Sequence, residues 1–509
     1  MTAADRLRPD IAWLSLHSRG VAALFALALV LAFGFLGSRP LWEPDEGRYT
    51  NVALTMLESG DWIDPMRNDD TGHWSKPPLT YWALASSFSA FGVNTWAARL
   101  PSALSLLACV LLVWLIARRL AQGTQTLAAL VYATMLLPSA AGQMVTTDFL
   151  LAACEALAVY GFVVFRFSAS PRRDAGLLVM WLGFALGFMT KGPPALIPLL
   201  PIALLHVLAP RATPARWFRH VAGVALFVLV AAPWYAAVTL RHSGLLHYFL
   251  GAEVVDRVAT DRFGRNGEWY GWLKVYVPTL LVGTLPWTAS LLRWFGALPR
   301  LLGQWRNASA RESDAPRLFV ALWALLPLAV FCAARSRLPL YLLPCFAAFA
   351  IAIAGVRHER GAGLPHWPWL ALWAAALLAL RHAAAVFPTD ADSSAWARAV
   401  RERVQSPVRE VVFVEDEPRY GLHLYLGAQV ERISRDPLQV HDYNPKFDES
   451  LWQELRETGF GGHAVYVTPE MGWNGIEQAI RAHGFRARRL GAPYAGRVVF
   501  AVAPDDAGS

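Results

Sequence analysis

Apolar runs long enough to cross a lipid bilayer recur along this chain, and they constrain its fold more than any other feature of the sequence. A membrane-spanning helix needs about 17–25 predominantly apolar residues, because the hydrocarbon core of a bilayer is about 30 Å thick. Eleven runs meet this requirement, so the chain is predicted to be a mainly α, polytopic membrane protein with about 11–13 transmembrane helices. The runs lie near residues 20–37, 100–117, 127–144, 149–165, 176–190, 193–209, 220–240, 273–292, 318–334, 339–356 and 367–387.

The composition agrees with this prediction and excludes several other classes. Hydrophobic residues make up 55% of the 509 residues and charged residues only 17%, whereas soluble domains carry about 25% charged residues. A soluble enzyme and a disordered chain are therefore excluded as descriptions of the whole protein. The net charge of +8 is scattered between apolar runs and forms no basic stripe, so no nucleic-acid partner is expected. The four cysteines lie within apolar runs, which predicts buried thiols and neither disulfides nor a zinc site.

The placement of arginine predicts the orientation of the chain. Short cytoplasmic loops carry an excess of Lys and Arg, and here the N-terminus and every even-numbered connection are rich in arginine. We therefore expect a cytoplasmic N-terminus, with the odd-numbered connections and the C-terminal tail in a periplasm. The first run has no small-x-small cleavage site and is predicted to be a permanent anchor. The arginines concerned are Arg6, Arg8, Arg19, Arg118, Arg119, Arg166, Arg172, Arg173, Arg211, Arg216, Arg219, Arg300, Arg306, Arg311, Arg317, Arg357 and Arg360.

Two domains follow from these patterns. Residues 1–387 form the predicted transmembrane domain, whose long outer loops cover 38–99 and 241–272. Residues 388–509 are less apolar and are predicted to form a small periplasmic α/β domain. Its expected strands lie near 410–415, 463–468 and 496–503, and its expected helices near 448–458 and 474–484.

The orientation of the chain does not explain three carboxylates near the outer face. Asp45 and Glu46 begin a stretch, 49–57, whose apolar residues recur with helical spacing, so we expect an amphipathic juxtamembrane helix there. Asp148 lies in a short outer turn between two runs. Charge at bilayer depth is costly and usually marks a functional cavity. The alternative is ordinary structure, because acidic residues also favour helix N-termini and cap them.

Cations lie near the same face. Two of the four lysines occur as Lys76-Pro-Pro and Lys191-Gly-Pro-Pro, where a rigid turn would hold a point charge toward a phosphate. The alternative for each is a lysine that snorkels to the interface. Arg335 and Arg337 oppose the positive-inside trend, which favours contact with a lipid headgroup or a substrate phosphate. The charges between Glu253 and Arg265 could instead be simply solvated.

Carboxylates and phosphate-seeking cations on one face of an apolar bundle suit transfer of a group from a lipid-linked phosphate donor. A carboxylate can deprotonate an acceptor hydroxyl, and fixed cations can stabilise the departing phosphate. The sequence has neither a Walker loop nor a G-x-G-x-x-G fingerprint, so no nucleotide is expected. Asp390-Ala-Asp392 matches D-x-D, but it follows the last run and is interpreted as a chance match.

Several motifs resemble one family. Glu43-Pro-Asp-Glu-Gly-Arg-Tyr49, Glu58-Ser-Gly-Asp-Trp62, Lys76-Pro-Pro-Leu-Thr-Tyr-Trp82 and Ala97-Ala-Arg-Leu-Pro-Ser-Ala103 resemble the start of the lipid A aminoarabinose transferases. These belong to the protein O-mannosyltransferase superfamily, which has the GT-C fold. Later matches, in the same order, are Thr147-Asp148, Thr190-Lys-Gly-Pro193, Leu285-Pro-Trp287 and Arg337-Leu-Pro-Leu-Tyr-Leu-Leu-Pro344. The resemblance covers about residues 20–356.

The resemblance implies the roles of individual residues. Asp45 would be the catalytic base and Asp148 the second acidic residue of the site, while Lys76, Arg257 and Tyr341 would hold the donor phosphate. The remaining predicted site residues are Glu46 among the acids and Arg48, Lys191 and Arg337 among the phosphate-binding cations. Aminoarabinose transferases usually have an acidic residue where this chain has Ser75, and a histidine where it reads Gly264-Arg-Asn-Gly-Glu-Trp269. No cofactor is therefore established, and whether a divalent metal binds stays open.

The expected function is inverting transfer of a sugar, with 4-amino-4-deoxy-L-arabinose as the candidate, from an undecaprenyl-phosphate donor. The acceptor would be lipid A or a related envelope glycolipid at the outer face of a bacterial inner membrane. Three alternatives stay open: transfer to protein, O-antigen or another envelope glycan; a transporter or flippase for a lipid-linked sugar, which needs no base; and a membrane-anchored binding or assembly protein.

Overall fold

The computed structural model describes residues 11–169, 173–210, 217–251, 265–404, 406–438, 443–457 and 464–505. Its residues cluster into two compact units, which are described one at a time. The first, here called the membrane unit, comprises Met1–Leu36, Ser102–Ala237 and Phe249–Arg381. The second, here called the outer unit, comprises Gly37–Pro101, Val238–Tyr248 and His382–Ser509. The first long loop thus clusters with the C-terminal tail, and the division at residue 388 stays a prediction.

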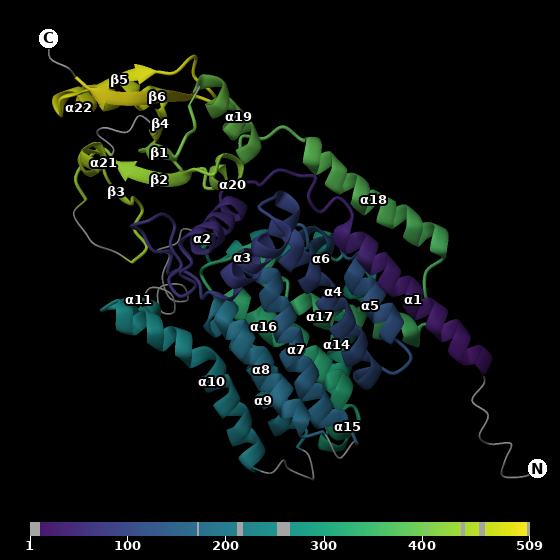
Figure 1. Ribbon diagram of the computed structural model, residues 1–509. Helices are drawn as coiled ribbons and strands as arrows, with labels where there is room; N and C mark the ends of the chain where they lie inside the picture. Colours follow the sequence, from purple (N-terminus) through teal and green to yellow (C-terminus); the bar gives the residue numbers. More distant parts are fainter. Residues whose placement is uncertain are drawn as a thin grey trace, which may run out of the picture. The chain divides into compact units, whose positions relative to one another are not determined.

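The membrane unit is built from helices, and each of the eleven apolar runs contains helical residues (Figure 1). Four helices, α4 (Thr95–Leu120), α10 (Trp217–Arg241), α11 (Leu245–Leu250) and α18 (Trp367–Val386), extend across a unit boundary. The others are α1 (Ile11–Phe33), α5 (Gln125–Thr134), α6 (Leu136–Ala141), α7 (Thr147–Phe167), α8 (Ala175–Lys191), η2 (Pro193–Leu196), α9 (Leu199–Leu208), α13 (Gly271–Gly283), α14 (Thr288–Gln304), α15 (Ala308–Ser313), α16 (Ala315–Ala333), η4 (Pro339–Leu342) and α17 (Cys345–Glu359).

Several expected spans are not single straight helices. Within the described residues, five helices are long and apolar enough to cross a membrane, namely α4, α7, α10, α16 and α18. The run predicted at 273–292 forms two helices, α13 and α14, which meet at 119°. Pro286 explains the break, since the residue before a proline disfavours helical backbone. The run 127–144 is likewise divided at Met135, between α5 and α6.

Glycines let α7 and α8 pack closely. A Cβ atom added at Gly161 would lie 2.3 Å from the backbone nitrogen of Met180, and one added at Gly183 would lie 2.5 Å from that of Ala158. Such small residues let membrane helices approach until their backbones touch. The hairpin fixes the start of α7 beside the end of α8, where Asp148 and Lys191 lie.

A buried arginine ties α18 to the rest of the membrane unit. The Arg381 guanidinium donates to the Leu31 carbonyl of α1, and to the Ser139 carbonyl and hydroxyl of α6 at 2.7 and 2.9 Å. A guanidinium in an apolar bundle must find acceptors, because each unsatisfied donor would cost several kcal/mol. The hydrogen bonds therefore position the last helix of the unit.

The outer unit is an α/β structure, as predicted for the tail. Its helices are α2 (Asp45–Ser59), α3 (Leu79–Phe91), α19 (Ser393–Arg403), α20 (Leu422–Leu426), α21 (Leu451–Glu457) and α22 (Trp473–Ala482), with a short turn η5 (Glu470–Gly472). The strands are β1 (Glu410–Val414), β2 (Gln429–Ser434), β3 (Glu449–Ser450), β4 (Ala464–Pro469), β5 (Phe485–Arg489) and β6 (Arg497–Pro504). The sequence predicted β1, β4 and β6, and the helices α21 and α22. It missed three strands, β2, β3 and β5, which are short or rich in charge.

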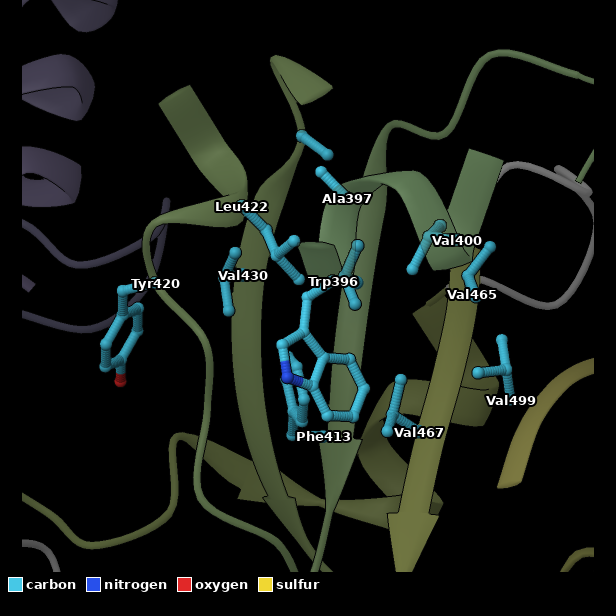
Figure 2. Close-up of a cluster of buried hydrophobic side chains, with 12 residues drawn as sticks. Trp396, Ala397, Val400, Phe413, Tyr420, Leu422, Val430, Val465, Val467 and Val499 are labelled. Atoms are coloured by element: carbon cyan, nitrogen blue, oxygen red, sulfur yellow. The ribbon is translucent and has the colours of Figure 1, made fainter. Parts of the chain in front are cut away.

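The strands form one sheet in the order β3-β2-β1-β4-β6-β5. The pairs β3–β2, β2–β1 and β1–β4 are parallel, and β4–β6 and β6–β5 are antiparallel. Both faces of the sheet are covered, because alternate residues of β1 enter different cores. Phe413 packs with Trp396 of α19 on one face (Figure 2), and Val412 packs with Trp473 of α22 on the other.

Candidate active site

Helix α2 begins at Asp45, as the amphipathic pattern predicted, and presents this carboxylate to solvent. The Asp45 side chain is 51% exposed and pairs with the Arg48 guanidinium one turn later. Asp45 is thus an accessible carboxylate with a guanidinium beside it.

Glu46, the next residue, lies in a different environment. Its side chain is only 3% exposed, and its carboxylate lies 2.8 Å from Arg39 and 3.1 Å from Arg99. It also accepts a hydrogen bond from the Trp42 backbone nitrogen at 2.9 Å. Burial alone would raise the pKa of Glu46, but the two guanidinium groups outweigh it and the pKa is lowered. Glu46 is therefore a buried carboxylate at the start of α2 that is paired with two arginines.

Glu43 joins α2 to the tail. Its Oε1 accepts hydrogen bonds from the Ser393 hydroxyl at 2.7 Å and the Gly421 backbone nitrogen at 2.6 Å. Its Oε2 is buried and has no hydrogen-bond partner within the described part of the chain. Burial raises the pKa of Glu43 to about 7, although both hydrogen bonds oppose the rise. A titratable group thus lies two residues before Asp45.

This carboxyl predicts a pH dependence of stability. In the unfolded chain Glu43 loses its proton near its ordinary pKa of 4.5, but in the folded chain near 7. Its contribution is thus fully present below about pH 4.5 and is lost as pH rises to about 7, by about 3 kcal/mol at most. We expect Glu43→Gln to abolish this loss, measured as the difference between the two proteins' thermal unfolding curves from pH 4.5 to 8. A difference that does not change with pH would contradict the assignment.

Lys76 lies in the loop before α3 and is buried. Its ammonium donates to the Ser75 carbonyl, and the Ser75 hydroxyl hydrogen-bonds His73 Nε2 at 2.8 Å. Ser75 therefore engages its histidine neighbour through a hydroxyl. Among the described residues, no three His, Cys, Asp or Glu side chains around Lys76 come close enough together to hold one metal ion.

In the membrane unit, three predicted site residues, Asp148, Lys191 and Tyr341, come together with a fourth residue, Arg265. Lys191, at the end of α8, forms an ion pair with Asp148, at the start of α7. The same ammonium lies 4.3 Å from the ring centroid of Tyr341 in η4. Arg265 donates to the Tyr341 hydroxyl at 3.0 Å. Thr146, rather than Asp148, caps α7, which leaves the Asp148 carboxylate for the lysine.

The remaining predicted cations have different surroundings. Arg337 is buried, and its terminal nitrogens donate to the carbonyls of Asn266, Glu268 and Cys332 at 2.7, 2.7 and 3.1 Å. These bonds make Arg337 a support for the backbone around it. Arg257 lies outside the described residues, as do the other loop charges from Glu253 to Arg262.

Within the described residues, one trio of carboxylates could hold a cation. Glu410, Glu431 and Glu454 place oxygen atoms within 4.8 Å of one another in the outer unit. Burial, and then the neighbouring carboxylates, raise the pKa of Glu431 to about 10. Glu431 also accepts a hydrogen bond from the Asn68 side chain at 3.0 Å.

Sequence reasoning missed Glu43, Arg99 and His423 as functional candidates. His423 hydrogen-bonds Asn51 at 2.8 Å and the Glu58 carboxylate at 3.0 Å, both in α2. Arg99 lies within a quoted motif, but the partner that explains it is more than 50 positions away. The sequence offered one signal: Glu43 and Glu58 each lie in one of the motifs that resemble the family. That position marks the two residues as candidates, but it does not identify Gly421 or His423 as the groups they contact.

Known proteins resemble this chain in sequence and in fold. The family model of dolichyl-phosphate-mannose-protein mannosyltransferases matches residues 75–236. In structure, the chain matches ArnT from Cupriavidus metallidurans bound to undecaprenyl phosphate, with a TM-score of 0.75 and 20% identity over 97% of this chain and 98% of that one. The protein therefore has the GT-C glycosyltransferase fold that the motifs implied.

The resemblance to the aminoarabinose transferases is also confirmed. The undecaprenyl phosphate-alpha-4-amino-4-deoxy-L-arabinose arabinosyl transferase of Edwardsiella ictaluri is 32% identical over 66% of this chain and 59% of its own. The enzyme of the same name from Erwinia tasmaniensis is 34% identical over 65% of this chain and 58% of its own. The match thus spans somewhat under two thirds of the length of these relatives.

Proposed function

We propose that the protein transfers 4-amino-4-deoxy-L-arabinose from an undecaprenyl-phosphate donor to lipid A. The reaction would take place at the periplasmic face of a bacterial inner membrane. The observation that carries the proposal is the cluster of Asp148, Lys191, Tyr341 and Arg265 in the membrane unit. Two cations held by an acid and a tyrosine hydroxyl suit a lipid-linked phosphate.

The proposed chemistry is a single displacement at the anomeric carbon of the donor sugar. Asp45 takes the proton from an acceptor hydroxyl as its oxygen forms the new bond to the anomeric carbon. The bond between that carbon and the donor phosphate oxygen breaks, and the phosphate leaves with the electron pair. The resemblance of the motifs assigns Lys76, Arg257 and Tyr341 to the donor phosphate, and Lys191 lies beside Tyr341 within the membrane unit. Fixed cations stabilise the charge that develops on the departing phosphate. Attack opposite the leaving phosphate inverts the anomeric centre.

Two of the sequence-derived assignments change within this proposal. Glu46 is assigned to positioning, because it is enclosed by two arginines. Arg337 is assigned to support of the loop at 266–268, because its terminal nitrogens already donate to carbonyls. Arg48 is assigned to orienting the Asp45 carboxylate with which it pairs.

The ends of the α7–α8 hairpin support the proposed orientation. Asp148 and Lys191 lie at one end, while Arg166 lies in the last turn of α7 at the other. Because short cytoplasmic loops are rich in arginine, the end that carries Asp148 and Lys191 is assigned to the periplasm.

Mass spectrometry of envelope lipids tests the proposal. We expect lipid A from a strain that makes the protein to carry pentosamine, and lipid A from the deletion strain to lack it. Expression of the wild-type protein from a plasmid, as the control, restores the modification. Unchanged lipid A in the deletion strain, together with loss of a sugar from protein, O-antigen or another glycan, would contradict the proposed acceptor.

A further inference from the structure

A pocket in the membrane unit has no role in the chemistry described above. It is an open pocket of about 560 Å³ between the start of α13 and the segment around the end of α16. This volume lies within the range of about 300–1,000 Å³ that is typical of small-ligand sites. Its walls include Glu268, Trp269, Trp272, Cys332, Arg335 and Arg337, and it is here called the Trp–Arg pocket.

Arg337 holds one wall of the Trp–Arg pocket in place. Its side chain is 4% exposed, and it donates to the Asn266 and Glu268 carbonyls on one side and to Cys332 on the other. Its backbone nitrogen donates to the Arg265 carbonyl at 2.9 Å. Gly271 completes the fit, because a Cβ there would lie 2.1 Å from the Asn266 carbonyl oxygen. The wall is therefore built before any ligand arrives.

The pocket offers cationic and aromatic groups together. The Arg335 side chain is exposed, and the Nε atom of Arg337 is buried and has no hydrogen-bond partner within the described residues. The Trp269 side chain is 84% exposed and that of Trp272 is partly exposed. Guanidinium groups bind phosphate in a bidentate manner, and an indole combines a large apolar body with one N–H donor. A phosphate attached to a sugar or lipid body matches both groups.

The Trp–Arg pocket is connected to the proposed donor cluster through one residue. The Arg265 side chain donates to the Tyr341 hydroxyl, while its carbonyl accepts the hydrogen bond from Arg337. Tyr341 in turn lies beside Lys191. Within the membrane unit, Arg265 therefore contacts both the wall of the pocket, through Arg337, and the groups assigned to the donor phosphate, through Tyr341.

We propose that the Trp–Arg pocket binds the phosphorylated sugar headgroup of the lipid acceptor. Arg335 contacts the acceptor phosphate, Trp269 and Trp272 pack against the sugar or the first part of the acyl chains, and Arg337 keeps the wall in place. The inference rests on the proposed function, because an acceptor site is needed only if the protein is a transferase.

Binding measurements on the full-length purified protein in nanodiscs test the pocket without relying on activity. The probes are lipid A, lipid A from which the phosphates have been removed, and phosphatidylglycerol. We expect the wild type to bind lipid A about tenfold more tightly than either other lipid. The double variant R335A/W272A should lose this preference. The matched control R300A/W367A, which changes an exposed arginine and an exposed tryptophan elsewhere, should retain it.

Steady-state kinetics then separate this proposal from the proposed function. In R335A/W272A we expect the KM for lipid A to rise about tenfold and the KM for the donor to stay unchanged, which also shows that the variant is folded. An unchanged lipid A KM and affinity would overturn the pocket but leave the transferase intact. Equal binding of phosphatidylglycerol would also overturn it, because the pocket would then be a general phospholipid contact. Phosphate-dependent binding without any sugar transfer would support the pocket and contradict the proposed function.

Discussion

Asp45→Asn is expected to lower sugar transfer by about 10²–10⁴-fold, the usual contribution of a general base. The amide has nearly the same shape as the carboxylate but cannot accept the acceptor's proton. Because the Asp45 side chain is half exposed, its replacement removes one surface ion pair with Arg48, and such pairs contribute only about 0–1 kcal/mol. The variant should therefore fold and bind the donor normally. Transfer of radiolabelled sugar by the purified protein, with the donor KM, gives the measurement.

Asp69→Asn is the matched control, because Asp69 is an exposed aspartate of the same outer loop with no assigned role. It should transfer sugar at the wild-type rate. Wild-type activity in Asp45→Asn would contradict the assignment of the base. A tenfold rise in the donor KM, with an unchanged kcat, would assign Asp45 to donor binding instead.

The sequence was sufficient for those parts of the fold that depend on local patterns. Apolar run length predicted the membrane helices, and the local sequence pattern of the tail predicted β1, β4 and β6. Residue chemistry also selected Asp148 and Lys191 separately, as charges without a topological task, and the structure pairs them. The angle between α13 and α14 was not predictable, because hydropathy measures apolar length and is insensitive to a bend.

The different roles of Asp45 and Glu46 could not be read from the sequence. The two acids are adjacent in one motif, and both were predicted to be catalytic. Their surroundings depend on Arg39 and Arg99, of which Arg99 lies more than 50 positions along the chain. Burial and long-range pairing decide which carboxylate is available to a substrate, and neither is a local property.

The role of the tail was also open from the sequence, and the contacts of α2 now suggest one. Glu43 accepts a hydrogen bond from the Gly421 backbone nitrogen, and Asn51 forms one with His423. All four residues belong to the outer unit. Helix α2, whose first turn carries the proposed base, is thus held by residues of the C-terminal tail.

Glu46→Gln should lower the free energy of unfolding far more than Asp45→Asn does. The substitution removes the negative charge from between Arg39 and Arg99, and the Arg99 side chain is only 1% exposed. Loss of one partner from a buried ion pair costs about 3–5 kcal/mol, because the remaining charges stay buried without compensation. This is a large part of a typical folding free energy of about 5–15 kcal/mol. The yield of monodisperse protein after detergent extraction, and its thermal unfolding, give the measurements.

Asp45→Asn is the natural control for this second variant, because it removes the same charge one residue earlier. If Glu46 is an anchor, the Glu46→Gln protein that survives extraction should melt at a lower temperature, while Asp45→Asn melts as the wild type does. Lost transfer by a fully stable Glu46→Gln protein would instead place Glu46 in the chemistry. A stable and active variant would show that the two arginines are satisfied without it. The pair of variants thus separates the acid that reacts from the acid that holds it in place.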